Sequence, residues 1–85
     1  MVYLHKVSCH DNVMKYEYGE MEGEYAGTIE FKVNVPTGTN FEGREPKLSF
    51  YGDNSFSILT SSALQGIAKF IRENNFPDNY LRATH

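Results

Sequence analysis

Three side chains that could bind zinc or form a nucleophile pair lie near the start of the chain: His5, Cys9 and His10. Zinc takes thiolate and imidazole ligands within one coordination sphere. In a strand, however, residues 5 and 9 are about 13 Å apart, and the neighbours Cys9 and His10 point to opposite faces. We therefore expect neither a zinc site nor a thiol–imidazole pair, and we predict that Cys9 is a small buried apolar side chain.

Carboxylates are concentrated in the segment YEYGEMEGEYAG, residues 16–27, which contains no basic residue. A hard cation needs several oxygens that converge at about 2.0–2.6 Å, and the spacing matches no calcium-binding loop. In a hairpin tip these carboxylates diverge, so we interpret the segment first as a solubilising edge and turn. No phosphate-binding loop, nucleotide fingerprint or serine elbow occurs elsewhere. The sequence thus predicts a non-enzymatic protein without a metal or cofactor.

Surface recognition is the remaining kind of function, and the acidic segment provides the leading candidate surface. Tyrosine contributes a large, rigid contact area with a polar end, and the surrounding glutamates would attract a basic partner. The candidate partner-binding residues are Tyr16, Glu17, Tyr18, Glu20, Glu22, Glu24 and Tyr25.

A second candidate surface is weakly basic. Residues 36–46 form the longest predicted loop, and loops of this length in compact domains are often functional. The loop carries Phe41, for which a position against the sheet edge is favoured over exposure. Two further basic side chains lie on the outer face of a predicted helix. The second surface comprises Phe41, Arg44, Lys69 and Arg72.

Alternation of apolar and polar residues predicts the strands that position the acidic segment. Segments 13–20 and 25–35 each show a period of two, and a two-residue turn at Glu22-Gly23 aligns their apolar faces. A slip of one residue would turn every apolar side chain to the wrong face. The predicted opposite pairs are Met14 with Phe31, Tyr16 with Ile29, Tyr18 with Gly27, and Lys15 with Glu30.

Two further segments read as strands. Residues 2–9 form a strand of mixed parity that turns at His10-Asp11-Asn12, although one long bent strand over 2–20 fits the same pattern. KLSFYG and SFSIL bracket Gly52-Asp53-Asn54, which is typical of a hairpin.

The apolar period becomes helical from residue 61 to residue 74. Thr60, Ser61 or Ser62 can cap this helix, and Ser62 with Gln65 has the spacing of a capping box. Asn74-Asn75 is a credible stop. The tail beyond the helix is expected to fold back as an irregular strap.

Together these elements predict an α+β fold. We expect an antiparallel meander of four to five strands with one C-terminal amphipathic helix on one face, in a single domain over residues 1–85. The predicted core comprises Met14, Ile29, Phe31, Val33, Leu48, Phe50, Ile58, Leu64, Ile67 and Ile71.

Composition narrows the class of function further. The chain has 85 residues, a net charge of -3 and one cysteine. The acidic balance disfavours duplex nucleic acid as a partner, and no stretch approaches the roughly 20 apolar residues of a membrane helix. The single cysteine excludes an internal disulfide and favours a cytoplasmic location.

We therefore expect a small regulatory or accessory module that binds another protein with a basic surface. An inhibitor of a nucleic-acid-binding protein, of the kind that phages and mobile elements make, is a special case. The alternative is a single-stranded nucleic-acid-binding module with an aromatic sheet face. It is disfavoured because the tyrosines alternate with glutamate instead of lysine or arginine. Self-association through an unpaired sheet edge is a further option.

Overall fold

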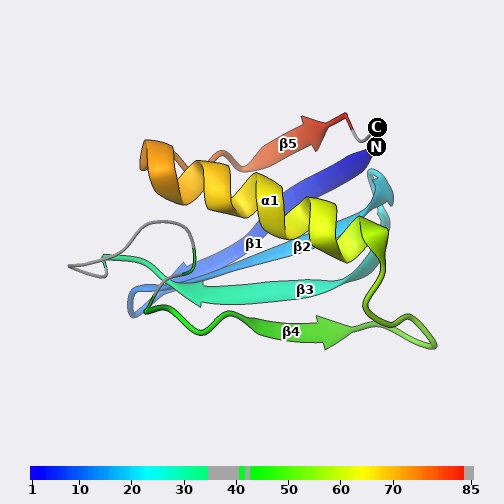
Figure 1. Cartoon of the computed structure of the whole chain (residues 1–85), viewed down its shortest axis with the longest axis horizontal. Coiled ribbons are helices and arrows are strands. Elements are labelled where there is room, and N and C mark those ends of the chain that lie inside the picture. The colour runs from blue at the N-terminus through cyan, green and yellow to red at the C-terminus, as the bar shows by residue number, and fades with distance from the viewer. Residues whose placement is uncertain (35–40, 42, 84–85) are drawn as a thin grey trace.

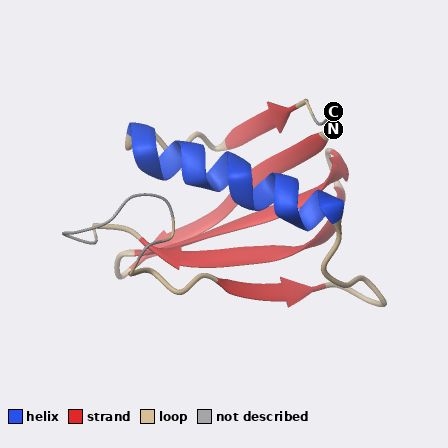
Figure 2. Ribbon diagram, in the orientation of Figure 1, coloured by secondary structure: helices blue, strands red, loops and turns tan. Residues whose placement is uncertain are grey.

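A computed structural model of the chain describes residues 1–34, 41 and 43–83, which form a five-stranded antiparallel sheet and a helix. The helix lies across one face of the sheet, and no described helix covers the other face (Figures 1 and 2). The predicted α+β class is confirmed. The elements are β1 (Val2–His10), β2 (Val13–Met21), β3 (Glu24–Lys32), β4 (Lys47–Phe50), α1 (Ile58–Glu73) and β5 (Asn79–Arg82).

The sheet order is β4-β3-β2-β1-β5, so the first four strands follow one another as a meander and the fifth returns to β1. The tail folds back as expected, but over Asn79–Arg82 it pairs with β1 as an antiparallel edge strand, so the prediction of an irregular conformation there is wrong. The physical reason is the path of α1, which crosses the sheet diagonally from the β4 side to the β1 side (Figure 1). The chain leaves α1 beside β1, whose backbone groups on that side would otherwise lack a partner strand.

A tight turn separates β1 from β2 and decides between the two alternatives left by the sequence. Asp11 and Asn12 occupy this turn with φ of 53° and 63°, a left-handed conformation that their short polar side chains tolerate. A bulge interrupts β1 between Lys6 and Ser8, and the strand beyond it is exposed. Cys9 lies there and is exposed, so its predicted burial is wrong.

The central hairpin of β2 and β3 has the predicted register. All four predicted opposite pairs are present, and Lys15 Nζ lies 3.7 Å from Glu30 Oε1. Near the tip the register shifts at Gly19, which pairs with Tyr25. The period of two and the turn chemistry were sufficient signals for this hairpin because one face is buried and a slip would expose it.

The second predicted hairpin, around residues 52–54, does not form. β4 pairs with β3, but residues 55–57 are not a strand and the helix begins at Ile58. Ser57 Oγ accepts from the Thr60 backbone N–H at 3.5 Å, and Thr60 Oγ1 accepts from the Ser57 N–H at 3.2 Å. This reciprocal capping box starts the helix earlier than the predicted box at Ser62 and Gln65. The predicted stop is confirmed, because Asn74 caps the helix with φ of 50°.

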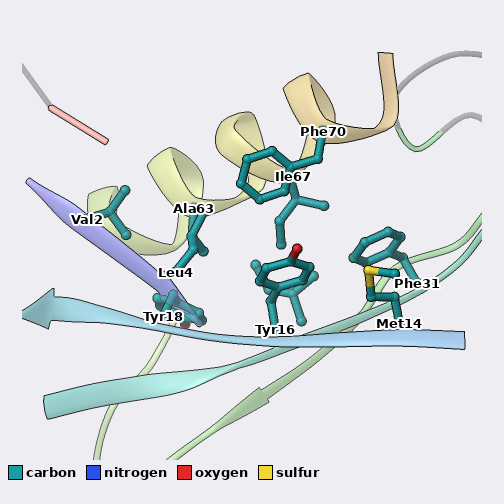
Figure 3. Packing of buried hydrophobic residues seen from close by; sticks show 10 residues of the cluster. Val2, Leu4, Met14, Tyr16, Tyr18, Phe31, Ala63, Ile67 and Phe70 are labelled. Carbon is teal, nitrogen blue, oxygen red and sulfur yellow. The ribbon is translucent and has the colours of Figure 1, made fainter. Parts of the chain in front are cut away.

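The core lies between α1 and the covered face of the sheet, where side chains from β1, β2 and β3 point toward the helix (Figure 3). Two predicted members are exposed, Phe50 at 37% on an edge strand and Ile58 at 86% in the first turn of the helix. Val33, Leu48, Leu64 and Ile71 are partly buried around the core. The buried cluster comprises Val2, Leu4, Met14, Tyr16, Tyr18, Ile29, Phe31, Ala63, Ile67 and Phe70.

Gly66 allows the helix to lie close to β1. A β-carbon at this position would lie 2.9 Å from Leu4 Cδ1, closer than ordinary van der Waals contact. The absence of a side chain therefore offsets the roughly 1 kcal/mol that glycine costs in a helix relative to alanine.

Candidate functional site

The acidic hairpin tip lies beside the start of α1 (Figure 1). β2 and β3 are joined through Glu22 and Gly23, and Gly23 has φ of 84°, which glycine adopts without steric cost. Met21 and Glu24 lie opposite each other at the base of the turn. The hairpin thus brings its glutamates next to the first residues of the helix.

Two adjoining hollows, which share Glu20 and Leu59, run between this tip and the helix. Their volumes are about 410 and 250 Å³. We call them together the tip groove. The first is lined by Met1, Glu20, Met21, Ile58 and Leu59, and the second by Glu20, Glu24, Tyr25, Ala26, Asn54 and Leu59.

The first hollow is lined by apolar side chains that are largely in contact with solvent. Met1 is 62% exposed, Met21 54% and Ile58 86%. Isolated exposed apolar residues are ordinary, but a contiguous group around a hollow marks a place where a partner can remove apolar surface from water. Three such residues line this one hollow.

The charged side chains that line the groove are carboxylates. Glu20, Glu22 and Glu24 form no ion pair with any residue in the described ranges. The first turn of α1 contains no acidic residue, so Glu20 places a carboxylate near the positive end of the helix macrodipole. That arrangement lowers the cost of gathering carboxylates here and leaves their charge available to a basic partner.

Two members of the predicted partner-binding set, Tyr16 and Tyr18, do not belong to any surface. They are 0% and 1% exposed beneath α1 (Figure 3), so their assignment to a contact surface is corrected. The Tyr18 hydroxyl is 2.9 Å from Thr60 Oγ1 and joins β2 to the helix cap. The period of two already placed both rings on the same face as Met14, which is the buried face.

The Tyr16 hydroxyl also forms a hydrogen bond within the protein. It donates a hydrogen bond to the backbone oxygen of Pro77, in the segment between α1 and β5. Burial, with a smaller contribution from the carboxylate of Asp78, raises the pKa of Tyr16 far above the ordinary value near 10. Ionising this phenol would place a charge in the core, so its role is structural.

Glu17 lies away from the tip groove, on the face of the sheet that no described helix covers. It lies across from His5 on β1 and from Thr28 on β3. The Tyr51 hydroxyl is 3.5 Å from Glu17 Oε2, and partial burial together with this carboxylate raises the pKa of Tyr51. The predicted acidic surface is therefore divided: Glu20, Glu24 and Tyr25 line the groove, Glu22 lies exposed in the turn, and Glu17 faces the other side.

The structure brings together part of the second predicted surface. Phe41 is half-buried with its ring edge-to-face against Phe31 at a centroid distance of 6.1 Å, as favoured from the sequence. Arg72 is exposed and lines a shallow hollow of about 440 Å³ with Phe41. The other residues of that hollow are Ser61, Leu64, Gln65, Ala68 and Arg82.

The other two members of that surface make contacts within the protein. Arg44 is 8% exposed, and its Nε donates to the backbone oxygen of Lys32 at 3.0 Å. Lys69 Nζ donates to the Tyr80 hydroxyl at 3.2 Å and lies 5.4 Å from the centre of that ring. Both side chains bind neighbouring elements, so neither lines the hollow beside Phe41.

The residues missed from the sequence are the apolar ones of the groove, Met1, Met21 and Ile58. Ile58 was expected in the core because SFSIL shows a period of two over a short run. The signal that could have placed it correctly is the Ser57 to Thr60 spacing, which makes Ile58 the first residue of a helix. No periodic signal distinguishes Met21, which adjoins the turn.

The described residues offer no metal centre or membrane-spanning helix. His5 Nδ1 bonds to Asn79 Oδ1, and His10 Nε2 lies 3.2 Å from Asp11 Oδ2. No group of three or more potential ligands (His, Cys, Asp or Glu) among residues 1–34, 41 and 43–83 is arranged to hold a metal ion. No helix in these ranges combines the length and apolar character needed to cross a membrane.

The fold and the groove define a small α+β protein with an apolar and acidic surface hollow. Comparisons with protein-family models, with curated proteins and with solved structures find no match. Function is therefore inferred from the geometry of the chain itself.

Proposed function

We propose that the protein is a non-enzymatic interaction module whose tip groove binds a segment of another protein with both apolar and basic side chains. The observation that carries this proposal is Ile58, which is 86% exposed and lines the same hollow as Met21 and Glu20. Apolar surface and carboxylates occur together in the groove, so a partner that is only apolar or only basic would leave part of it without a matching group.

The apolar surface and the carboxylates of the groove contribute to binding in different ways. Removing apolar surface from water stabilises a complex by roughly 25 cal/mol per Å², so Ile58 and Met21 would supply affinity. Rim carboxylates mainly speed encounter with a basic partner and contribute less to holding the complex. Affinity and association rate can therefore be separated by substitution.

A protein that binds nucleic acid is a partner that presents such a basic surface. Occupation of that surface would make this protein an inhibitor or regulator, and a phage or mobile element is a source that fits a product of this size. Its single cysteine, Cys9, suits the cytoplasm, where nucleic-acid-binding proteins act.

The experiment uses synthetic peptides and two matched pairs of variants of the full chain. Ile58→Ser is compared with Phe56→Ser, because Phe56 is 59% exposed but does not line the groove. Glu20→Lys with Glu24→Lys is compared with Glu45→Lys and Glu73→Lys, which change the net charge equally at exposed sites outside the groove.

For a peptide carrying leucine and lysine, Ile58→Ser is expected to weaken binding about tenfold and Phe56→Ser less than twofold. The groove charge reversal is expected to slow association in a salt-dependent way, and the control reversal to have a much smaller effect. Equal effects within either pair, in variants that melt like the parent, would remove the groove as the binding site. Affinity capture with the parent and with Ile58→Ser would then identify natural partners that depend on the groove.

A further inference from the structure

The helix-free face of the sheet carries aromatic side chains where a solvated face is ordinarily polar. Tyr3 and His5 come from β1, Tyr25 from β3, and Tyr51 from the residue after β4. Register places Glu17 of β2 directly across from His5. We call Tyr3, His5, Glu17, Tyr25 and Tyr51 the aromatic face.

The rings of this face are held in place by specific contacts. Tyr25 lies between two others, 6.3 Å from the Tyr3 ring and 6.1 Å from the His5 ring, with an interplanar angle of 22° to His5. The Tyr3 hydroxyl donates to Asn79 Oδ1 at 3.2 Å, and His5 Nδ1 lies 2.9 Å from the same oxygen. Because that oxygen only accepts, the proton lies on His5 Nδ1. β5 therefore fixes two of the rings, which reduces the entropy lost when a ligand binds.

Gly19 of β2 lies between the strand positions of Tyr3 and Tyr25. Gly19 pairs with Tyr3 on one side and with Tyr25 on the other. A β-carbon there would lie 1.9 Å from the Glu24 backbone oxygen, so no larger residue fits. The two tyrosines can thus meet across bare backbone.

Glu17 differs from the other carboxylate on this face. Glu30 is 36% exposed and has Lys15 Nζ at 3.7 Å as its cationic partner. Glu17 is also partly buried, but its described bond comes from the neutral Tyr51 hydroxyl, and it forms no ion pair with a described residue. Thr28, directly opposite Glu17, is 2% exposed although no described helix covers it, so larger neighbouring side chains must close over it. Glu17 is thus a carboxylate of the aromatic face that has no ion pair among the described residues.

We propose that the aromatic face binds the guanidinium group of an arginine in an extended segment of a partner protein, with Glu17 as the anion and the neighbouring rings as the stacking surface. A cation is attracted to the face of an aromatic ring and to a carboxylate at once. Arginine is favoured over lysine because its planar group can stack on a ring while it donates two parallel hydrogen bonds to a carboxylate.

The same rings could stack on bases, but the charges disfavour nucleic acid. Base-stacking platforms combine aromatic residues with lysine and arginine that track the phosphates. Here carboxylates lie near the rings: Glu17 bonds to the Tyr51 hydroxyl, and partial burial, with a smaller contribution from Glu22, raises the pKa of Tyr3. The lysines of this face, Lys15 and Lys47, both lie across from Glu30, and Lys15 forms an ion pair with it.

This inference goes beyond the proposed function and does not depend on it. Of the five residues of the aromatic face, only Tyr25 also lines the tip groove. The substitutions at Glu17, Glu30 and Tyr3 therefore leave the groove intact, and the probe peptide has no apolar side chain that the groove could bind.

The test is a titration of the full chain with a labelled peptide of alternating glycine and arginine. The comparison probes are the matched glycine–lysine peptide and a single-stranded oligothymidylate. Glu17→Gln is the test variant, and Glu30→Gln is the matched control because it removes the same charge from the same face. Tyr3→Leu removes one ring without altering charge, and Ile58→Ser reports on the groove.

The arginine peptide is expected to bind at least about threefold tighter than the lysine peptide. Glu17→Gln and Tyr3→Leu are each expected to weaken it about threefold to fivefold, whereas Glu30→Gln and Ile58→Ser change it less than twofold. Equal losses for Glu17→Gln and Glu30→Gln, or equal binding of the two peptides, would overturn the proposal. Tight binding of oligothymidylate with none of either peptide would also overturn it and assign the face to nucleic acid. An unchanged arginine affinity in folded Tyr3→Leu would exclude the stacking role.

Discussion

Tyrosine side chains lie on both faces of the sheet, but in different surroundings. Tyr16 and Tyr18 lie under the helix with their hydroxyls bonded inside the protein. Tyr3, Tyr25 and Tyr51 lie on the uncovered face and are at least partly exposed, and the Tyr51 hydroxyl bonds to the Glu17 carboxylate. The difference follows from strand parity and from the position of α1, because a tyrosine under a helix must satisfy its hydroxyl internally while one in the open can meet a partner.

The largest effect on stability is expected from substitution of an isoleucine in α1 that is buried in the core. Ile67 is fully buried in the core, whereas Ile58 is 86% exposed on the same helix. Ile67→Ala should reduce the free energy of unfolding by about 2–5 kcal/mol, and Ile58→Ala by less than about 0.5 kcal/mol. Urea denaturation measures both. Similar losses for the two variants would mean that Ile58 packs in the core and that the tip groove is not open.

The next largest loss of stability is expected from substitution of Gly27, which lies opposite Tyr18 in the sheet. A β-carbon there would lie 2.3 Å from the backbone oxygen of Ser49 and 3.1 Å from the Tyr18 hydroxyl. Gly27→Ala must displace β4, so we expect a loss of about 1–3 kcal/mol by thermal or urea unfolding. A variant as stable as the parent would show that β4 is not held against β3 as described.

A smaller difference is expected between hydroxyl deletions on the two faces. Tyr16→Phe removes a hydrogen bond to a carbonyl in the interior and should cost about 1 kcal/mol, because the Pro77 oxygen loses its donor. Tyr3→Phe removes an exposed bond and should cost less than about 0.5 kcal/mol. The comparison is made at neutral pH by urea denaturation, and a larger loss for Tyr3→Phe would reverse the assignment of the two faces.

Alkaline pH should change the stability of the parent more than that of Tyr16→Phe. Because the folded pKa of Tyr16 is raised above the unfolded value near 10, its contribution is fully present below about pH 10 and is lost as pH rises. Above that pH the parent should lose stability more steeply than Tyr16→Phe, by up to about 1.4 kcal/mol per pH unit. Parallel stability curves from pH 9 to about 11 would show that Tyr16 titrates normally and is not buried.

The sequence predicts an element of the fold well where the alternation of apolar and polar residues is long, and poorly where it is short. β2 and β3 were predicted with their register because a long alternation leaves one consistent pairing, and that pairing already placed Tyr16 and Tyr18 on the buried face. SFSIL failed because five residues with a period of two can also begin a helix, and local capping by Ser57 overrides the alternation.

The candidate sites were less predictable, because they depend on distant segments. Tyr3, Tyr25 and Tyr51 come to one face only after β1, β2, β3 and β4 are aligned, and β5 supplies the Asn79 that fixes the first ring. Ile58 and Met21 meet only when the helix start lies beside the hairpin tip. Neither juxtaposition leaves a pattern in the order of the residues.

The smallest predicted effect distinguishes the two carboxylates of the open face. Glu30→Gln removes a surface ion pair with Lys15 and should cost about 0.2–1 kcal/mol, less at high salt. Glu17→Gln has no ion pair to lose and should leave the free energy of unfolding nearly unchanged. Unfolding at low and high salt measures both variants, and a larger salt-dependent loss at Glu17 would mean that it already has a cation.

The most direct test of the central claim, that the tip groove is the binding surface, is nuclear magnetic resonance of the labelled chain during titration with the leucine–lysine peptide. If the tip groove binds the peptide, the methyl signals of Met21, Ile58 and Leu59 will shift together and saturate at one affinity, while those of Leu64 and Ala68 on the hollow beside Phe41 will stay in place. Shifts confined to Leu64 and Ala68, with the groove signals unmoved, would contradict that claim.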